Sequence, residues 1–194
     1  MQAAFKYVNE FYKLSEKSIK KCLAEIEINN SMKTVFKDLQ SRNYELCIIS
    51  DSNTLLIETI LEANNLSDAF SGKIFANKGY FHANECIKVI PVNELLNENK
   101  TSFNCESNMC KPNICKRAIL ENILRINSVV NHVIYVGDGK IDFCPGLSLD
   151  KNDHFFVKKN LSLHKILNKS GMKEKFKANI RFWKNPIEII DQLK

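Results

Sequence analysis

The sequence contains no run of about 18 consecutive apolar residues, so it predicts no membrane-spanning helix. Its first residues, MQAAFKYVNEFYK, are charged and amphipathic and lack the apolar stretch of a secretion signal. The seven cysteines are odd in number, which without such a signal favours free thiols in a cytoplasmic protein. No basic face is interleaved with aromatic residues, so the net charge of +6 does not predict a nucleic-acid partner.

The pattern of apolar residues changes along the chain. Residues 1–44 have helical spacing and predict helices. Short apolar runs predict buried strands at 45–50, 73–77, 132–138, 153–157 and 179–183. Helical repeats lie between and after them, at 51–66, 113–126, 162–170 and 185–193. Residues 78–110 predict irregular structure, and the alternation as a whole predicts an α/β fold with a parallel sheet covered by helices.

The first of these strands ends in polar residues. Ser50 and Asp51 follow the apolar run, and Ser52 or Asn53 precedes the next helix. A hydroxyl at a strand end before a helix N-terminus is a good phosphate site, because the helix amides and dipole favour anions. The same residues are also typical helix caps, so the sequence leaves both interpretations open.

A second strand end carries two carboxylates on a glycine-rich turn. In VGDGKID, Asp138 and Asp142 are four residues apart and Gly137 and Gly139 allow close backbone approach. Mg²⁺ prefers such oxygen ligands, usually one or two carboxylates completed by water and phosphate. An Asx-turn is an alternative, whereas a dinucleotide-binding loop would need a third glycine that the sequence lacks.

Two further features have alternative interpretations. Lys116, at the start of a predicted helix, could offset phosphate charge, and Lys111 stands five residues before it. Cys105, Cys110 and Cys115 are spaced as C-x4-C-x4-C, with His82 or Cys86 as a possible fourth zinc ligand. That spacing is not typical of structural zinc, and free thiols are the preferred interpretation.

Taken in order, the segments CIISDSNTLLIETILEA, CKPNICKRAIL and VIYVGDGKIDFCP resemble the haloacid dehalogenase superfamily, and most closely its PHOSPHO-type phosphatases. The resemblance implies a Rossmann-like parallel sheet over residues 45–194 and a partial helical cap over residues 1–44. It implies a phosphomonoesterase acting on a small phosphorylated metabolite such as phosphoethanolamine, phosphocholine or pyridoxal 5′-phosphate, with Mg²⁺ as cofactor.

The resemblance also implies roles for individual residues. Ser50 corresponds to the residue that binds the transferring phosphoryl group, with Asp51 and Asn53 nearby on the substrate side. Lys116 corresponds to the lysine that balances the phosphate charge, and Lys111 is its rival in a near-duplicated segment. The metal residues correspond to Asp138, which would hold Mg²⁺, and Asp142, which would support the ion or its water shell.

Two departures from the family pattern stand out. Ile141 replaces an Asn in the GDG-x-N-D turn, and no Asp-x-Asp-x-Thr nucleophile motif occurs anywhere in the sequence. The first strand of the family sheet, which carries that motif, is therefore expected to be missing. Two expectations follow: an N-terminally truncated phosphatase, or a catalytically inactive pseudophosphatase that acts as an interaction protein.

Overall fold

The computed structural model describes residue 12 and residues 15–82, 86–92, 114–127 and 129–194. Two helices come first, α2 (Glu16–Ala24) and α3 (Asn30–Ser41). Ser15 caps the N-terminus of α2, because its hydroxyl accepts a hydrogen bond from the Ser18 amide at 3.2 Å. Helix α3 is amphipathic and buries Val35 and Leu39, so the prediction of helices in this region is confirmed for the described residues.

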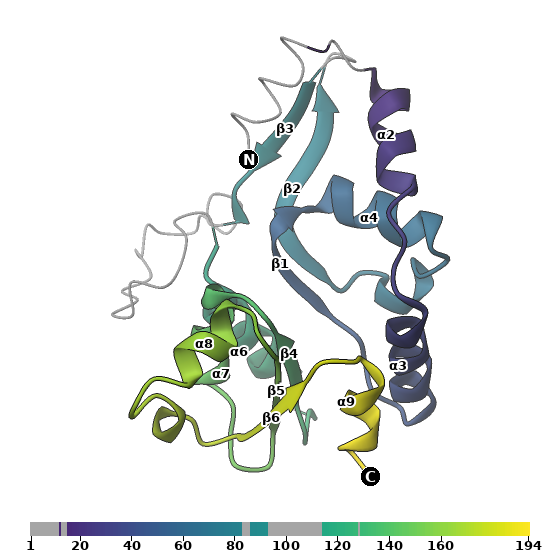
Figure 1. The fold of residues 1–194 in the computed structure, drawn as a ribbon. Helices are drawn as coiled ribbons and strands as arrows, with labels where there is room; N and C mark the ends of the chain where they lie inside the picture. Colours follow the sequence, from purple (N-terminus) through teal and green to yellow (C-terminus); the bar gives the residue numbers. More distant parts are fainter. Residues whose placement is uncertain (1–11, 13–14, 83–85, 93–113, 128) are drawn as a thin grey trace.

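Three strands form the first sheet, in the order β1-β2-β3. Strand β1 (Ile48–Asn53) pairs in parallel with β2 (Ile74–His82), which pairs antiparallel with β3 (Cys86–Ile90). Helix α4 (Thr54–Ala63) and the short 3₁₀ helix η1 (Asp68–Phe70) connect β1 to β2. Figure 1 shows the β2–β3 hairpin at the top of the view, beside α2.

The β2–β3 hairpin corrects the expectation of irregular structure over residues 78–110. Residues 78–82 and 86–90 are strand instead. Polar residues interrupt both segments, so neither has the apolar run of a buried strand, and backbone pairing across the hairpin stabilises them. Residues 83–85 and 93–110 of that interval lie outside the described residues.

The second sheet is parallel throughout and has the order β4-β5-β6. Helix α6 (Lys116–Ile126) precedes β4 (Ile134–Gly137), which is followed by η2 (Lys140–Asp142) and α7 (Phe143–Gly146). Strand β5 (His154–Lys158) leads into α8 (Ser162–Leu167) and η3 (Lys173–Lys175). Strand β6 (Asn179–Trp183) and helix α9 (Ile187–Asp191) end the chain.

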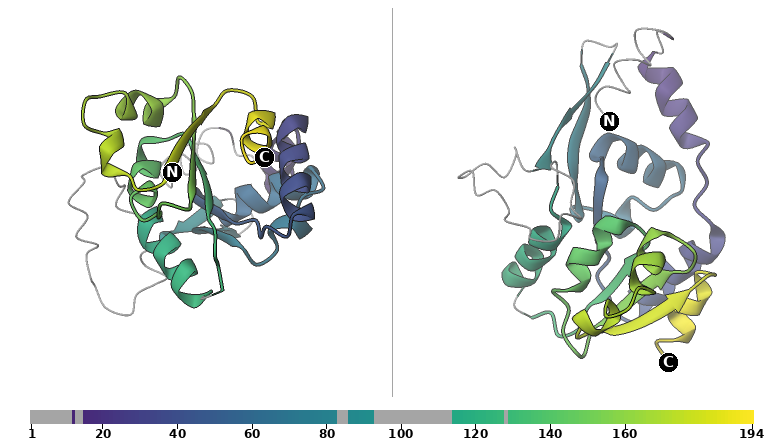
Figure 2. Two further views of the ribbon diagram at one scale, coloured as in Figure 1. Left: turned by 90° about the horizontal axis from the view of Figure 1, so that it is seen from below. Right: turned by 60° about the vertical axis from the view of Figure 1, so that its left-hand side comes forward.

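The two sheets meet through their helices and side chains. Helix α9, from the end of the chain, packs against α3 near its beginning, as Figure 2 shows from two further directions. One apolar cluster joins Leu39, Leu46 and Phe156 across both sheets, and a second surrounds Phe155 beneath α6, α7 and α8. The predicted α/β class is confirmed, but the described strands form two sheets rather than a continuous one.

Two helices begin where the sequence placed their starts. Helix α4 begins at Thr54, directly after the predicted cap Asn53, although β1 continues three residues past its predicted end at residue 50. Helix α6 begins at Lys116. Among the described helices, none is long and apolar enough to cross a membrane.

Candidate functional site

The turn after β4 folds back on the Asp142 side chain. The backbone amides of Asp138 and Gly139 both donate to Asp142 Oδ2, at 3.2 and 2.9 Å. A Cβ atom added to Gly137 would lie 2.6 Å from Asp142 Cβ, which is too close for any other residue to fit without a shift. The glycine predicted to permit a close approach therefore does so, toward the second carboxylate of the motif.

The other oxygen of Asp142 holds two side chains from neighbouring elements. Lys116 Nζ, at the start of α6, donates to Oδ1 at 2.8 Å, and the Tyr135 hydroxyl on β4 donates to it at 2.9 Å. Both charged groups are sheltered, because the side chains of Lys116 and Asp142 are 12% and 4% exposed. A buried ion pair of this kind is stable only when the remaining lone pairs of the carboxylate also accept hydrogen bonds. Here the turn amides donate those hydrogen bonds.

Tyr135 is a site residue that the sequence analysis missed. Burial, reinforced by the negative charges of Asp142 and Asp138, raises the pKa of its hydroxyl well above its usual value. The tyrosine therefore stays protonated and donates to Asp142. A sequence signal existed, because a tyrosine inside an otherwise apolar buried strand needs a hydrogen-bond partner for its hydroxyl.

Asp138 differs from Asp142 in its exposure and in its partners. Asp138 is exposed, and its carboxylate makes no hydrogen bond or ion pair with the described residues. Its backbone carbonyl accepts from the Leu163 amide at 3.1 Å and from the Ser162 hydroxyl at 3.4 Å, both at the start of α8. The main chain of Asp138 is thus fixed while its carboxylate remains available to a ligand.

The end of β1 bears the other predicted residues. Between Ile49 and Asn53 the strand advances four residues while its partner β2 advances two, from Phe75 to Asn77, so residues 50–52 bulge out of the ladder. Inside this bulge the Ser50 hydroxyl accepts from the Ser52 amide at 3.1 Å.

Two buried asparagines lie against the backbone of this bulge. Asn53 is fully buried and caps α4, its side-chain oxygen accepting from the Leu56 amide at 3.1 Å. Asn77, also fully buried, donates to the carbonyls of Asp51 and Ser52 at 2.9 and 2.8 Å. The cap predicted at Ser52 or Asn53 is confirmed at Asn53, whose substrate-binding role stays a prediction. The sequence did not indicate Asn77, because its hydrogen-bond partners lie about 25 residues away along the chain.

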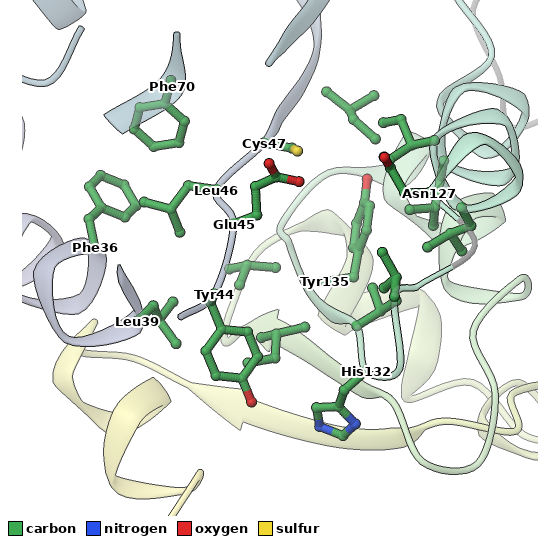
Figure 3. Close-up of a pocket in the computed structure, with 18 of the residues that line it drawn as sticks. Phe36, Leu39, Tyr44, Glu45, Leu46, Cys47, Phe70, Asn127, His132 and Tyr135 are labelled. Atoms are coloured by element: carbon green, nitrogen blue, oxygen red, sulfur yellow. The ribbon is translucent and has the colours of Figure 1, made fainter. Parts of the chain in front are cut away.

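A groove of about 870 Å³ separates the two sheets. Figure 3 shows its walls: Leu46 and Cys47 come from the segment leading into β1, and Tyr135 comes from β4 on the opposite side. Lys116, Asp138 and Asp142 also line it. The structure therefore brings together three of the predicted residues on one wall, while Ser50, Asp51 and Asn53 lie on the strand that forms the other.

No group of three or more His, Cys, Asp or Glu side chains is positioned to hold an ion in the part of the chain that the structure describes. One or two carboxylates with water and phosphate suffice for Mg²⁺, and Asp138 offers one. All four hydrogen bonds of the Asp142 carboxylate go to protein groups. This geometry suits support of the water shell of the ion better than direct contact with the ion.

The predicted alternatives are partly outside the described residues. Lys111, Cys105 and Cys110 lie there, so neither the rival lysine nor the zinc interpretation is tested. Cys115, the described member of the cysteine series, is a buried free thiol.

A family model described as "Putative Phosphatase" matches residues 1–194. This chain belongs to that family. The resemblance to PHOSPHO-type phosphatases is thereby confirmed, because members with that name are among its relatives.

Three relatives illustrate the range of this family. Probable phosphatase phospho1 of Danio rerio is 30% identical over 157 residues, which cover 79% of this chain and 54% of the relative. Inorganic pyrophosphatase 2 of Arabidopsis thaliana is 32% identical over 165 residues, or 85% and 57% of the two chains. Pyridoxal phosphate phosphatase PHOSPHO2 of Homo sapiens is 27% identical over 200 residues, or 100% and 78%. The chain thus spans 54% and 57% of the first two relatives.

Proposed function

We propose that this chain carries the phosphate- and magnesium-binding part of a phosphomonoesterase that acts on small phosphorylated metabolites. One observation carries the proposal: a buried ion pair, Lys116 with Asp142, lies beneath a turn whose other carboxylate, Asp138, is exposed and unengaged by the described residues. A fixed cation beside an available carboxylate is what a phosphate–Mg²⁺ complex requires.

Each residue in and around this turn has a distinct role. Lys116 offsets the negative charge of the phosphoryl group, and Asp142 holds the ammonium in place at 2.8 Å. Asp138 is the carboxylate that would hold Mg²⁺, which when bound supplies a Lewis acid for the phosphoryl oxygens. The Tyr135 hydroxyl donates to the same Asp142 oxygen at 2.9 Å, which helps to hold the carboxylate that positions the Lys116 ammonium.

The bulge at the end of β1 supplies the second half of the proposed site. Ser50 would donate its hydroxyl to the phosphoryl group, and Asp51 would lie near the head group of the substrate. Helix α4 begins directly after the bulge, and its N-terminal dipole favours an anion there. Asn53 and Asn77 would act by holding the bulge in shape, since both are fully buried.

The names of the relatives suggest which substrates to test. PHOSPHO2 is named for pyridoxal phosphate, and the plant relatives are named for inorganic pyrophosphate and thiamine phosphate. We propose pyridoxal 5′-phosphate, phosphoethanolamine and phosphocholine as the first candidates. All three are small phosphate monoesters that present a terminal dianionic phosphoryl group.

A second candidate function follows from the sequence itself. The chain contains no Asp-x-Asp-x-Thr motif, so the aspartyl-phosphate route needs a nucleophile that these 194 residues do not supply in that form. The alternative is a pseudophosphatase, which binds phosphate and Mg²⁺ without turnover and acts as an interaction protein, by binding another molecule.

Titration calorimetry of the purified chain with inorganic phosphate, with and without Mg²⁺, tests the proposed site. We expect phosphate binding that depends on Mg²⁺, and an affinity about tenfold or more weaker in Asp138→Asn. Asp150→Asn, at another exposed carboxylate, is the matched control and should bind as the unchanged chain does. Phosphate binding that ignores both Mg²⁺ and Asp138→Asn would contradict the proposal.

Hydrolysis assays with the three monoesters then separate the two candidates. Turnover that Asp138→Asn abolishes excludes the pseudophosphatase. Mg²⁺-dependent phosphate binding with no turnover supports it.

A further inference from the structure

Three basic side chains lie on one face of the second sheet, in a place that the proposed function does not use. His132 precedes β4, His154 begins β5 and Arg181 lies in the middle of β6, and these strands are neighbours (Figure 1). The pairs Ile134 with His154 and His154 with Asn179 set the register. Alternate residues of a strand point to the same face, so the residues two positions before Ile134 and two positions after Asn179 share the face of His154. These residues are His132 and Arg181, and we call the three side chains the basic cluster.

Ring contacts confirm that the side chains of the basic cluster approach one another. The rings of His132 and His154 meet edge to face, with centroids 4.9 Å apart. The His154 ring lies 6.2 Å from the ring of Phe156, and the Arg181 Cζ atom lies 5.9 Å from the centroid of that same ring. All three basic residues are half-buried, so part of each remains open to solvent.

The basic cluster has unused hydrogen-bonding capacity. The side chains of His132 and Arg181 make no hydrogen bond or ion pair with the described residues, and His154 Nδ1 is buried without a hydrogen-bond partner among them. Asp153 precedes His154, but its two carboxylate oxygens accept from two backbone amides, at 2.9 and 2.7 Å. A buried polar atom without a partner is rare, and a bound ion or water is a common explanation for one.

The charges of the basic cluster oppose one another. Burial, together with the charges of Arg181 and His132, lowers the pKa of His154, and the charge of Asp153 acts in the opposite direction. Like charges at this separation are unfavourable, so the cluster disfavours the imidazolium form of His154 when no ligand is bound. An anion placed among the three groups would remove the repulsion and favour that form.

We propose that the basic cluster is a binding site for a small free oxyanion, such as inorganic phosphate, and that this site requires no Mg²⁺. The Arg181 guanidinium offers N–H donors in the fork that matches two oxygens of one anion. Each imidazolium ring adds further N–H donors. Phosphate and sulfate suit the site better than acetate, because three positive groups attract a dianion more strongly than a monoanion.

The basic cluster and the proposed phosphate and magnesium site lie at opposite ends of the second sheet. Asp138 follows the carboxyl end of β4, and His132 precedes its amino end. Four residues of strand separate the two ends by roughly 13 Å, so one small anion cannot contact both. The inference is therefore independent of the proposed function, since it needs neither Asp138 nor a metal ion.

Proton NMR of the imidazole rings tests the site directly, because the chain has four histidines. The resonances are assigned with His132→Gln and His154→Gln, and followed against pH with sulfate or with NaCl at the same ionic strength. Sulfate is the probe because it remains a dianion throughout the titration, and Mg²⁺ is absent. We expect sulfate to raise the pKa of His132 and of His154 by about 0.5 or more. The pKa values of His82 and His164, which lie outside the cluster, should not change.

Two arginine variants locate the bound anion. Arg181→Gln removes the permanent charge of the cluster and should weaken sulfate binding, measured by calorimetry, about tenfold or more. Arg125→Gln, at an exposed arginine on α6, is the matched control and should bind sulfate unchanged. In the unchanged chain, sulfate affinity should rise as pH falls through the pKa values of the two cluster histidines, because the imidazolium forms bind the anion.

Three results would overturn the inference. Equal pKa changes at all four histidines would show general screening by salt, and an equal effect of acetate would show that no dianion site exists. Sulfate affinity unchanged in a folded Arg181→Gln variant, with circular dichroism as the check of folding, would exclude the cluster. If that variant does not fold, the titration of the unchanged chain decides alone. Because Mg²⁺ is absent from every arm, this site can be found where the Mg²⁺-dependent phosphate site is not, and the reverse.

Discussion

Strands β4 and β5 are hydrogen-bonded neighbours of similar apolar composition, yet they differ in exposure. Phe155, Phe156 and Val157 of β5 are all 0% exposed, whereas Val136 of β4 is 42% exposed. Strand β5 is paired on both sides and β4 on one within the described residues. Helix α8 also packs against β5. An apolar strand is therefore buried by its lateral neighbours as well as by the layers above and below it.

The largest expected effect contrasts the two carboxylates of the turn. Asp142→Ala leaves the buried Lys116 ammonium without a partner and should lower the free energy of unfolding by about 3–5 kcal/mol. Asp138→Ala, at an exposed carboxylate, should change it by less than about 0.5 kcal/mol. Urea denaturation measures both values. The double variant Asp142→Asn with Lys116→Met should recover part of the loss, and no recovery would mean that the pair is not the cause.

Two valines test the comparison of strands directly. Val157→Ala removes two methyl groups from a fully buried site and should cost about 2 kcal/mol. Val136→Ala removes the same atoms from a half-open site and should cost less than about 1 kcal/mol. Thermal unfolding of the two variants gives the difference. Equal losses would show that β4 is covered in solution.

Two glycines of the turn differ in how closely an added methyl group would approach Asp142. Gly137→Ala places a methyl group 2.6 Å from Asp142 Cβ and should cost about 1–2 kcal/mol while weakening Mg²⁺-dependent phosphate binding. At Gly139 the nearest atom to an added methyl group is Asp142 Oδ2 at 3.4 Å, so Gly139→Ala should be milder. Denaturation combined with calorimetry checks both effects. If Gly137→Ala bound phosphate with unchanged affinity, the turn would not be part of the proposed site.

A smaller effect concerns Tyr135 and depends on pH. Tyr135→Phe removes one buried hydrogen bond to Asp142 and should cost about 1 kcal/mol at neutral pH. Because the folded protein raises the pKa of this tyrosine, its contribution is present below the ordinary value of 10.0 and is lost as pH rises above it. The stability of the unchanged chain should therefore fall faster above that pH than the stability of Tyr135→Phe. Parallel curves would show that Tyr135 ionises normally.

The sequence predicted the local elements of the site well, because short apolar runs and capping residues act over a few positions. The strand before Asp138, the cap at Asn53 and the helix beginning near Lys116 are all local features. The β2–β3 hairpin was missed, since its stability comes from backbone pairing rather than from an apolar run. Tyr135 and Asn77 were missed because their partners lie in other segments.

The sequence by itself determined the family, the α/β class and the residue types at the two strand ends, because these are written in local motifs. The tertiary structure decided how those residues divide their work: it buried Asp142 with Lys116 and left the Asp138 carboxylate exposed. It also decided that the described strands form two sheets with a groove between them. The physical reason is that burial and pairing depend on which segments meet in space, and spacing along the chain does not specify that.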